Sequence, residues 1–60
     1  SPNILLREYR LLRSLELLRD EQRNIAQTTF DVGFGSPSYF TKCFQKRFGL
    51  QPLAYMRARV

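Results

Sequence analysis

With sixty residues, the chain is long enough for one domain at most, and a domain this small buries a modest share of its surface, so marginal stability is expected. One cysteine and no histidine argue against an internal disulfide or a metal site, and no cofactor is predicted. The chain carries a net charge of +5 but no bilayer-length apolar run and no signal-peptide pattern, which favours a soluble protein of the reducing cytoplasm without a membrane partner.

Glycine and proline divide the chain into four predicted helices. Ser1 followed by Pro2 is typical of an N-cap with proline at the first helical position, and the helical pattern continues without a breaker to about Asp20. A second, shorter helix is expected to begin near the capping residue Asn24 and to end before Gly33. No segment alternates with the two-residue period of a strand, so the predicted fold is all-α.

The same signals predict two more helices. Ser36 and Pro37 repeat the cap-plus-proline pattern, and Gly49, which tolerates positive φ, ends this third helix. Pro52 begins a last short helix.

The first predicted helix has two apolar faces. One face, at 100° per residue, holds four aliphatic residues: Ile4, Leu11, Leu15 and Leu18. The other holds Leu5, Tyr9 and Leu12. This pattern alone fits the central helix of a bundle or a coiled-coil arm equally well. Because the remaining segments are too short to cover both faces, we expect a partner from outside this chain.

The third predicted helix has one aromatic ridge and one polar arc. The ridge consists of Phe40, Phe44 and Phe48, which recur every four residues. The arc combines hydroxyl, amide and ammonium groups without a carboxylate: Ser38, Thr41, Lys42, Gln45 and Lys46. An ordinary solvated face also has a polar arc, but these groups can donate to base edges and phosphates in a major groove.

Positive charge is concentrated in the second half of the chain. Residues 1–31 carry five arginines and five acidic residues, a balance of zero, whereas residues 32–60 carry five basic residues and no acid. A polyanion such as double-stranded DNA is therefore a candidate partner for the second half.

Residues 32–52, with the sequence VGFGSPSYFTKCFQKRFGLQP, carry a specific motif. This segment closely resembles the second helix-turn-helix of AraC/XylS-type bacterial transcription regulators, in which V-G-F, S-Y-F, a basic residue, F, G and P follow in this order. Upstream residues resemble the linker helix of that family: Arg10, Leu11, Ser14, Leu17 and Leu18. The resemblance covers nearly all of the chain.

The resemblance implies a small, homeodomain-like helix-turn-helix bundle preceded by a long linker helix. Residues 1–20 are expected to form the linker helix and residues 21–60 the DNA-binding subdomain, together a fragment of a larger DNA-binding domain. Since such regions resemble two helix-turn-helix units joined by one helix, the second apolar face is expected to pack on a first unit missing from this chain. RNA polymerase is an expected partner of the full protein.

The resemblance also implies roles for individual residues. Gly33 is expected to allow the tight turn, Phe34 to fill the space between the two helices, and Tyr39 and Phe40 to hold the third helix on the second. The recognition helix, residues 36–48, is expected to enter the major groove. The expected base-reading residues are Pro37, Ser38, Thr41, Lys42 and Gln45. The expected phosphate contacts are Ser36, Lys46 and Arg47.

Two features depart from the family pattern or stand outside it. Thr28 and Thr29 occupy positions where the family usually has a larger aliphatic residue and alanine, so they weaken helix propensity and bring hydroxyls toward the core, where they are expected to bond to helix carbonyls. Cys43 is expected to be a small, partly buried filler rather than a redox sensor, because no second cysteine is present to resolve it.

Three functions compete on this sequence. Sequence-specific DNA binding in transcription regulation leads, and the alternative is a helical protein-interaction module with an incidental basic tail. A membrane-surface peptide is disfavoured, because glycines divide the chain into short helices and the aromatic ridge indicates a folded bundle. Enzymatic activity is not expected, and no catalytic residue is assigned, because the groups needed for acid-base or nucleophilic chemistry are missing.

Overall fold

The computed structural model describes residues 2–20 and 22–58. This part of the chain forms helices and no strand, which confirms the all-α prediction. The helices, in chain order, are α1 (Pro2–Leu17), α2 (Ile25–Asp31), α3 (Pro37–Phe48) and α4 (Pro52–Arg57).

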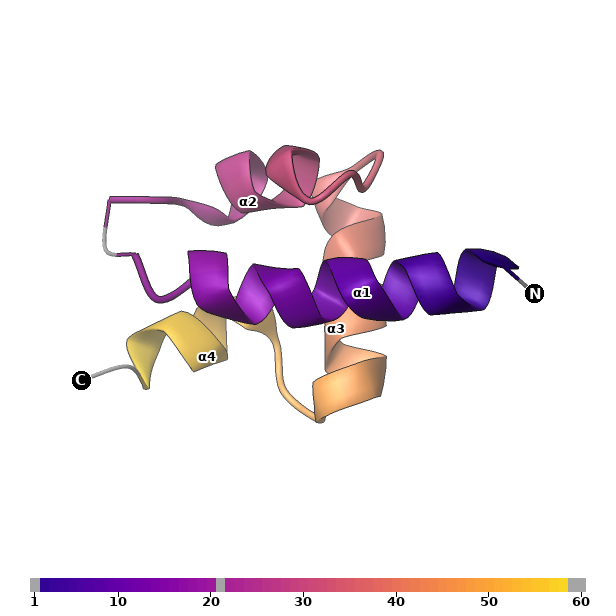
Figure 1. Ribbon diagram of the computed structural model, residues 1–60. Helices are drawn as coiled ribbons and strands as arrows, with labels where there is room; N and C mark the ends of the chain where they lie inside the picture. Colours follow the sequence, from indigo (N-terminus) through magenta and orange to yellow (C-terminus); the bar gives the residue numbers. More distant parts are fainter. Residues whose placement is uncertain (1, 21, 59–60) are drawn as a thin grey trace.

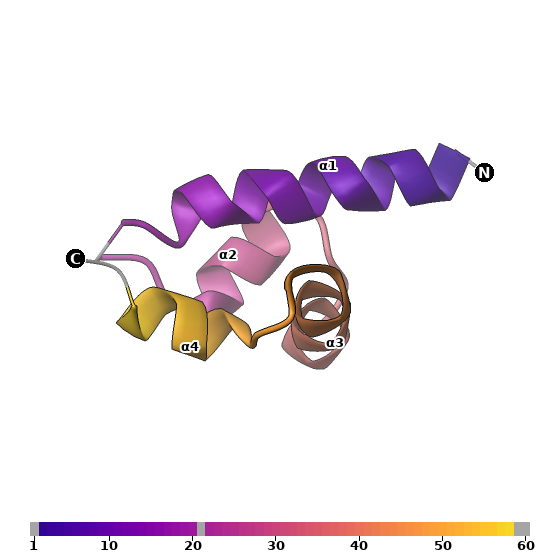
Figure 2. The same cartoon turned by 90° about the horizontal axis from the view of Figure 1, so that it is seen from below.

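The long helix α1 lies across the other three. α3 crosses it steeply, with α2 near the start of α3 and α4 near its end (Figure 1). In the turned view, α2, α3 and α4 all lie on one side of α1, and the first turns of α1 project beyond α3 (Figure 2). One side of α1 is therefore covered by the bundle and the other is open.

Local capping chemistry places the ends of α2 and α3. The Asn24 side chain accepts a hydrogen bond from the Gln27 backbone N–H at 2.7 Å, and the Gln27 side chain accepts one from the Asn24 N–H at 3.1 Å. Ser36 caps α3 by accepting from the Tyr39 N–H at 3.2 Å. Gly49, with φ of 83°, ends α3 and donates to the Gln45 carbonyl. These predicted boundaries are confirmed.

The ends of α1 agree with the prediction less closely. α1 begins at Pro2, as expected, while the predicted cap, Ser1, lies outside the described residues. α1 ends at Leu17 rather than about Asp20, because the last carbonyls accept bonds from residues three positions ahead, including Asp20 N–H to Leu17 O at 3.1 Å. Such bonds tighten the final turn into a 3₁₀-type turn.

The core is aromatic and lies between α3 and the elements around it. Its buried apolar residues are Leu11, Leu18, Val32, Phe34, Phe40 and Phe44. The Phe34 ring lies 5.2 Å from the Phe40 ring and 5.7 Å from the Tyr39 ring, between centroids, so it fills the space beside α3 as predicted. Phe40 is fully buried, whereas Tyr39 is 49% exposed and contributes mainly through Phe34.

The two threonines of α2 are both fully buried, and only one finds a partner. The Thr29 hydroxyl donates to the Ile25 carbonyl at 2.7 Å, as expected for a helical threonine. The Thr28 hydroxyl has no hydrogen-bond partner in the described chain, so the expected bond is not formed there. A buried hydroxyl without a partner costs stability.

The second apolar face of α1 is open. Leu5 is 75% exposed and Tyr9 65% exposed, and Leu12 is exposed as well. Ile4 shares the face of the buried Leu11 but is 56% exposed, because the first turns of α1 project beyond α3 (Figure 2). Nothing in the described chain covers this surface.

Candidate nucleic-acid interface

The polar arc of α3 lies on its solvent side, and its aromatic ridge faces the core, with Phe48 half-buried at the end of the ridge. Among the residues predicted to read bases, Pro37, Ser38, Lys42 and Gln45 are exposed, while Thr41 is half-buried because it follows Phe40 on the flank of the core. The ridge holds the helix firmly, with Phe40 and Phe44 fully buried and neighbouring rings 5.7 Å and 4.7 Å apart between centroids along it. α3 therefore presents one ordered polar surface.

Carboxylates are absent from the exposed arc and are paired elsewhere. In the described part of the chain, each carboxylate lies near an arginine: Glu16 near Arg13, Asp20 and Asp31 near Arg23, and Glu8 near Arg47. Neither Lys42 nor Lys46 forms an ion pair with any described residue. Their ammonium groups leave the arc positively charged, which suits a polyanionic partner.

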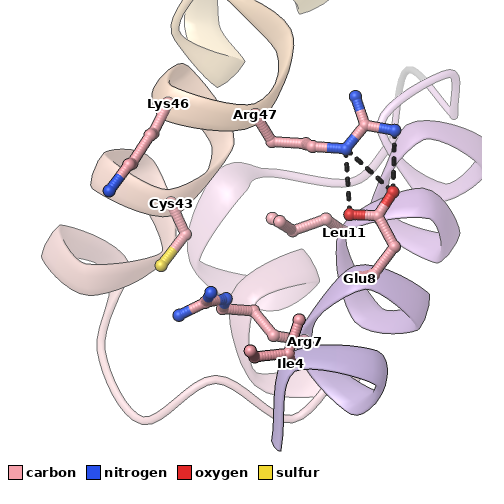
Figure 3. Close-up of a pocket in the computed structure, with 7 residues that line it drawn as sticks. All are labelled: Ile4, Arg7, Glu8, Leu11, Cys43, Lys46 and Arg47. Carbon is pink, nitrogen blue, oxygen red and sulfur yellow. Dashed lines mark hydrogen bonds and ion pairs between the residues drawn. The ribbon is translucent and has the colours of Figure 1, made fainter. Parts of the chain in front are cut away.

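Arg47, a predicted phosphate contact, connects α3 to α1. Its Nε donates to both carboxylate oxygens of Glu8, at 2.8 and 2.9 Å, and its Nη2 lies 2.7 Å from Oε1 (Figure 3). The guanidinium also lies 5.0 Å from the centre of the Phe48 ring. This hydrogen bond to Arg47 lowers the pKa of Glu8, and the same contact raises the pKa of Arg47.

The remaining predicted phosphate contacts lie at opposite ends of α3. Ser36 uses its hydroxyl oxygen to cap the helix and is half-buried, whereas Lys46 is exposed near the last turn. The structure thus brings the predicted base-reading residues together on one face. It separates the predicted phosphate residues into a capping serine, a free lysine and an arginine already engaged by a carboxylate.

Sequence reasoning missed a groove between α1 and α3. It is lined by Ile4, Arg7, Glu8, Leu11, Cys43, Lys46 and Arg47 (Figure 3). Arg7 lies four residues before the buried Leu11, so helical spacing indicated that it shares the bundle side of α1. The part of α3 that it approaches lies about forty residues further along the chain, which local patterns do not reveal. Cys43 is partly buried and packs against the core, as expected of a filler.

The described residues hold no cluster of three metal-binding side chains of the histidine, cysteine or carboxylate type. None of the helices described is both long and apolar enough to cross a membrane.

Comparison with protein families matches residues 1–58 to the family described as a helix-turn-helix domain. The chain belongs to the AraC-type helix-turn-helix family. The predicted resemblance is confirmed, and DNA-binding transcription regulation is the function that this family supports. This AraC-type domain carries its family motif on the turn after α2, on α3 and at the start of α4.

Curated relatives are named mainly as regulators. The chain is 38% identical over 50 residues to the uncharacterized HTH-type transcriptional regulator YdeC of Bacillus subtilis, covering 83% of the chain and 17% of that protein. It is 36% identical over 52 residues to the HTH-type transcriptional regulator ExsA of Pseudomonas aeruginosa, covering 87% of the chain and 19% of that protein.

A further curated relative is named as a kinase rather than as a transcriptional regulator. The chain is 47% identical over 55 residues to histidine kinase P4 of Formosa agariphila, covering 92% of the chain but 4% of that protein. The AraC-type domain thus spans less than a fifth of each of these three relatives. No solved structure matches the chain.

Proposed function

We propose that this AraC-type domain recognises specific DNA sequences by placing α3 in the major groove. The observation that carries the proposal is the exposed arc of α3, which has hydroxyl, amide and ammonium groups but no carboxylate, on a helix held by a buried aromatic ridge. A major groove is wide enough for an α-helix, and these side chains match the acceptors on base edges and phosphates.

The proposed base-reading residues lie on the polar side of α3, and all except the half-buried Thr41 are exposed: Pro37, Ser38, Thr41, Lys42 and Gln45. Ser36, Lys46 and Arg47 are the proposed phosphate contacts, which orient the helix without reading sequence. No catalytic role is proposed, and the kinase named in the Formosa agariphila protein is not carried over, because the chain covers 4% of that protein.

We further propose that the domain acts within a longer bacterial regulator. Residues 1–20 serve as a linker helix and residues 21–60 as the helix-turn-helix subdomain. The exposed Leu5, Tyr9 and Leu12 of α1 support docking of a second helix-turn-helix unit on that face. RNA polymerase is the proposed partner of the full protein, and binding to chromosomal DNA would place it in the cytoplasm on the nucleoid.

The same exposed apolar face favours a second candidate function, in which α1 docks on another protein and the basic residues of the second half take no part in binding. The two functions use different surfaces, α1 in one case and α3 in the other. Mutation of α3 therefore distinguishes them.

The test is a titration of the ¹⁵N-labelled chain with random-sequence duplex DNA, followed by NMR at low and moderate salt. We expect the shifted amides to cluster on the polar arc, from Ser38 to Lys46, and the shifts to fade as salt rises. Lys42→Ala should weaken binding by about fivefold or more, corresponding to roughly 1 kcal/mol for one lost contact. Arg13→Ala is the control, because Arg13 lies on α1 and pairs with Glu16.

A folded chain whose amides do not respond to DNA, or respond only on the apolar face of α1, would contradict the DNA-binding proposal. Equal loss of affinity in Lys42→Ala and Arg13→Ala would show that net charge, rather than the arc of α3, determines binding.

A further inference from the structure

The groove between α1 and α3 has a composition suited to an anion. Its volume is about 300 Å³, roughly the liquid volume of ten water molecules, so a phosphodiester group fits inside it. Three basic side chains and one carboxylate line it, namely Arg7, Lys46, Arg47 and Glu8, which gives a balance of three minus one, or +2. The Arg7 side chain extends from α1 toward Cys43 and Lys46 of α3 (Figure 3).

Of the four charged side chains in the groove, Glu8 and Arg47 form an ion pair, and Arg7 and Lys46 do not. Glu8 and Arg47 neutralise each other through the Nε and Nη2 contacts at 2.7 to 2.9 Å. Arg7 and Lys46 are exposed, and neither forms an ion pair with a described residue. Arg7 attracts the Glu8 carboxylate at longer range and helps to lower its pKa, but the hydrogen bonds of that carboxylate go to Arg47. The Arg7 and Lys46 head groups therefore keep their hydrogen-bond donors for a ligand.

The groove adjoins the surface proposed to read DNA. Lys46 lies one helical turn after Lys42, so the arc of α3 continues into the mouth of the groove. A helix in the major groove has a sugar-phosphate backbone along each side. The first half of α1 supplies Ile4, Arg7 and Glu8 to the lining of the groove.

We infer that this groove seats a phosphate of the DNA backbone, contacted by Arg7 from α1 and Lys46 from α3. The inference rests on the proposed DNA binding and adds a new contact residue, Arg7, on the linker helix. Besides its proposed phosphate contact, Arg47 acts as a positioning residue, because its hydrogen bonds to Glu8 join α1 to α3 beside the groove. The first helix becomes part of the DNA interface as well as a support for the bundle.

The first test measures the salt dependence of binding. Affinity for a random-sequence duplex of about 20 base pairs is measured by fluorescence anisotropy from about 50 to about 200 mM salt. Each phosphate contact contributes about 0.9 to the slope of log K against log salt concentration. We expect Arg7→Gln to lower the magnitude of the slope by about 0.9 and Arg7→Lys to retain it.

Arg13→Gln provides the matched control. It removes the same charge from the same helix, but Arg13 pairs with Glu16 and does not line the groove. Its slope should equal that of the wild type. Circular dichroism on each variant checks that helix content is unchanged, which is expected because the Arg7 side chain makes no ion pair or hydrogen bond to a described residue.

The second test uses Cys43 as a built-in reporter. It is the single cysteine of the chain, and it lines the groove together with Arg7 and Lys46. A phosphate seated there covers the thiol, so saturating duplex should slow alkylation by uncharged iodoacetamide several-fold. Arg7→Gln should reduce that protection at equal DNA occupancy.

The outcomes separate this inference from the proposed function. If the wild-type chain shows no salt-dependent binding to duplex DNA, both fail. If it binds, but Arg7→Gln keeps the wild-type slope or Cys43 reacts equally fast with and without DNA, the groove is not the phosphate seat and the role of α3 stands. An equal loss of slope in Arg13→Gln would overturn the specific role of Arg7.

Discussion

Replacement of Thr28 by valine should stabilise the fold, because valine removes a buried hydroxyl and keeps the side-chain shape. The Thr28 residue is fully buried, and its Oγ1 has no hydrogen-bond partner in the described chain. Leaving a buried polar group unsatisfied costs about 1–3 kcal/mol, and threonine and valine have similar helix propensities. We therefore expect Thr28→Val to raise the free energy of unfolding by about 1 kcal/mol, at the low end of that range.

Thr29→Val is the matched control in the same helix. Its hydroxyl donates to the Ile25 carbonyl at 2.7 Å, so valine there loses a hydrogen bond and should cost roughly 0.5–1 kcal/mol. The cost stays small because a helical carbonyl also accepts the backbone N–H four residues ahead.

Thermal unfolding followed by circular dichroism measures both variants. In a domain of this size, 1 kcal/mol shifts the melting temperature by roughly 4–8 °C, so the two threonine variants should move in opposite directions. A lower melting temperature for Thr28→Val would refute the reasoning, because it would mean that the hydroxyl finds a partner in solution. Equal effects at Thr28 and Thr29 would show that the one hydrogen bond does not distinguish them.

Two further predictions concern the turn and the ion pair. Gly33→Ala and Gly49→Ala should each destabilise the fold by about 1–2 kcal/mol in urea unfolding, because both glycines have positive φ. The new Cβ at Gly33 would lie 2.9 Å from the Arg10 Nε, but this atom is near the end of a flexible side chain that can move away. The hydrogen bond from Arg47 lowers the pKa of Glu8 below 4.5, its ordinary value. The ion pair therefore stabilises the fold fully above pH 4.5, and this stabilisation is lost as the pH falls through the lower pKa of the folded state. The melting temperature of Glu8→Gln should therefore decrease less than that of the wild type on acidification from about pH 5 to about pH 3. An unfolding cost near zero at either glycine, or parallel pH profiles, would contradict these two predictions.

Helix positions could be predicted from the sequence because their ends depend on local chemistry. Asn24, Ser36 and Gly49 each act on backbone groups within a few residues, so their identities and spacing were sufficient. The buried ridge of α3 followed in the same way from a four-residue repeat. The end of α1 was less predictable, because no glycine or proline marks it and the last turn tightens gradually.

Contacts between distant segments could not be predicted. The Glu8–Arg47 pair joins residues 39 apart in the sequence, and nothing local to either residue identifies its partner. The exposure of Ile4 depends on how far α1 projects beyond α3, which is a property of packing rather than of helical period. The polar arc of α3 was predictable as a surface, whereas the groove beside it required the crossing of two helices to be known.

The bond between Glu8 and Arg47 also affects where a second unit docked on α1 would lie along DNA. Together with the buried Leu11 and Leu18, it sets the direction in which α1 leaves the bundle, and a helix of 16 residues is a stiff lever about 24 Å long. One turn of DNA measures about 34 Å, so a unit docked along this lever would be held at a set distance and rotation around the double helix. Two recognition elements coupled in this way tolerate little change in the number of base pairs between their sites.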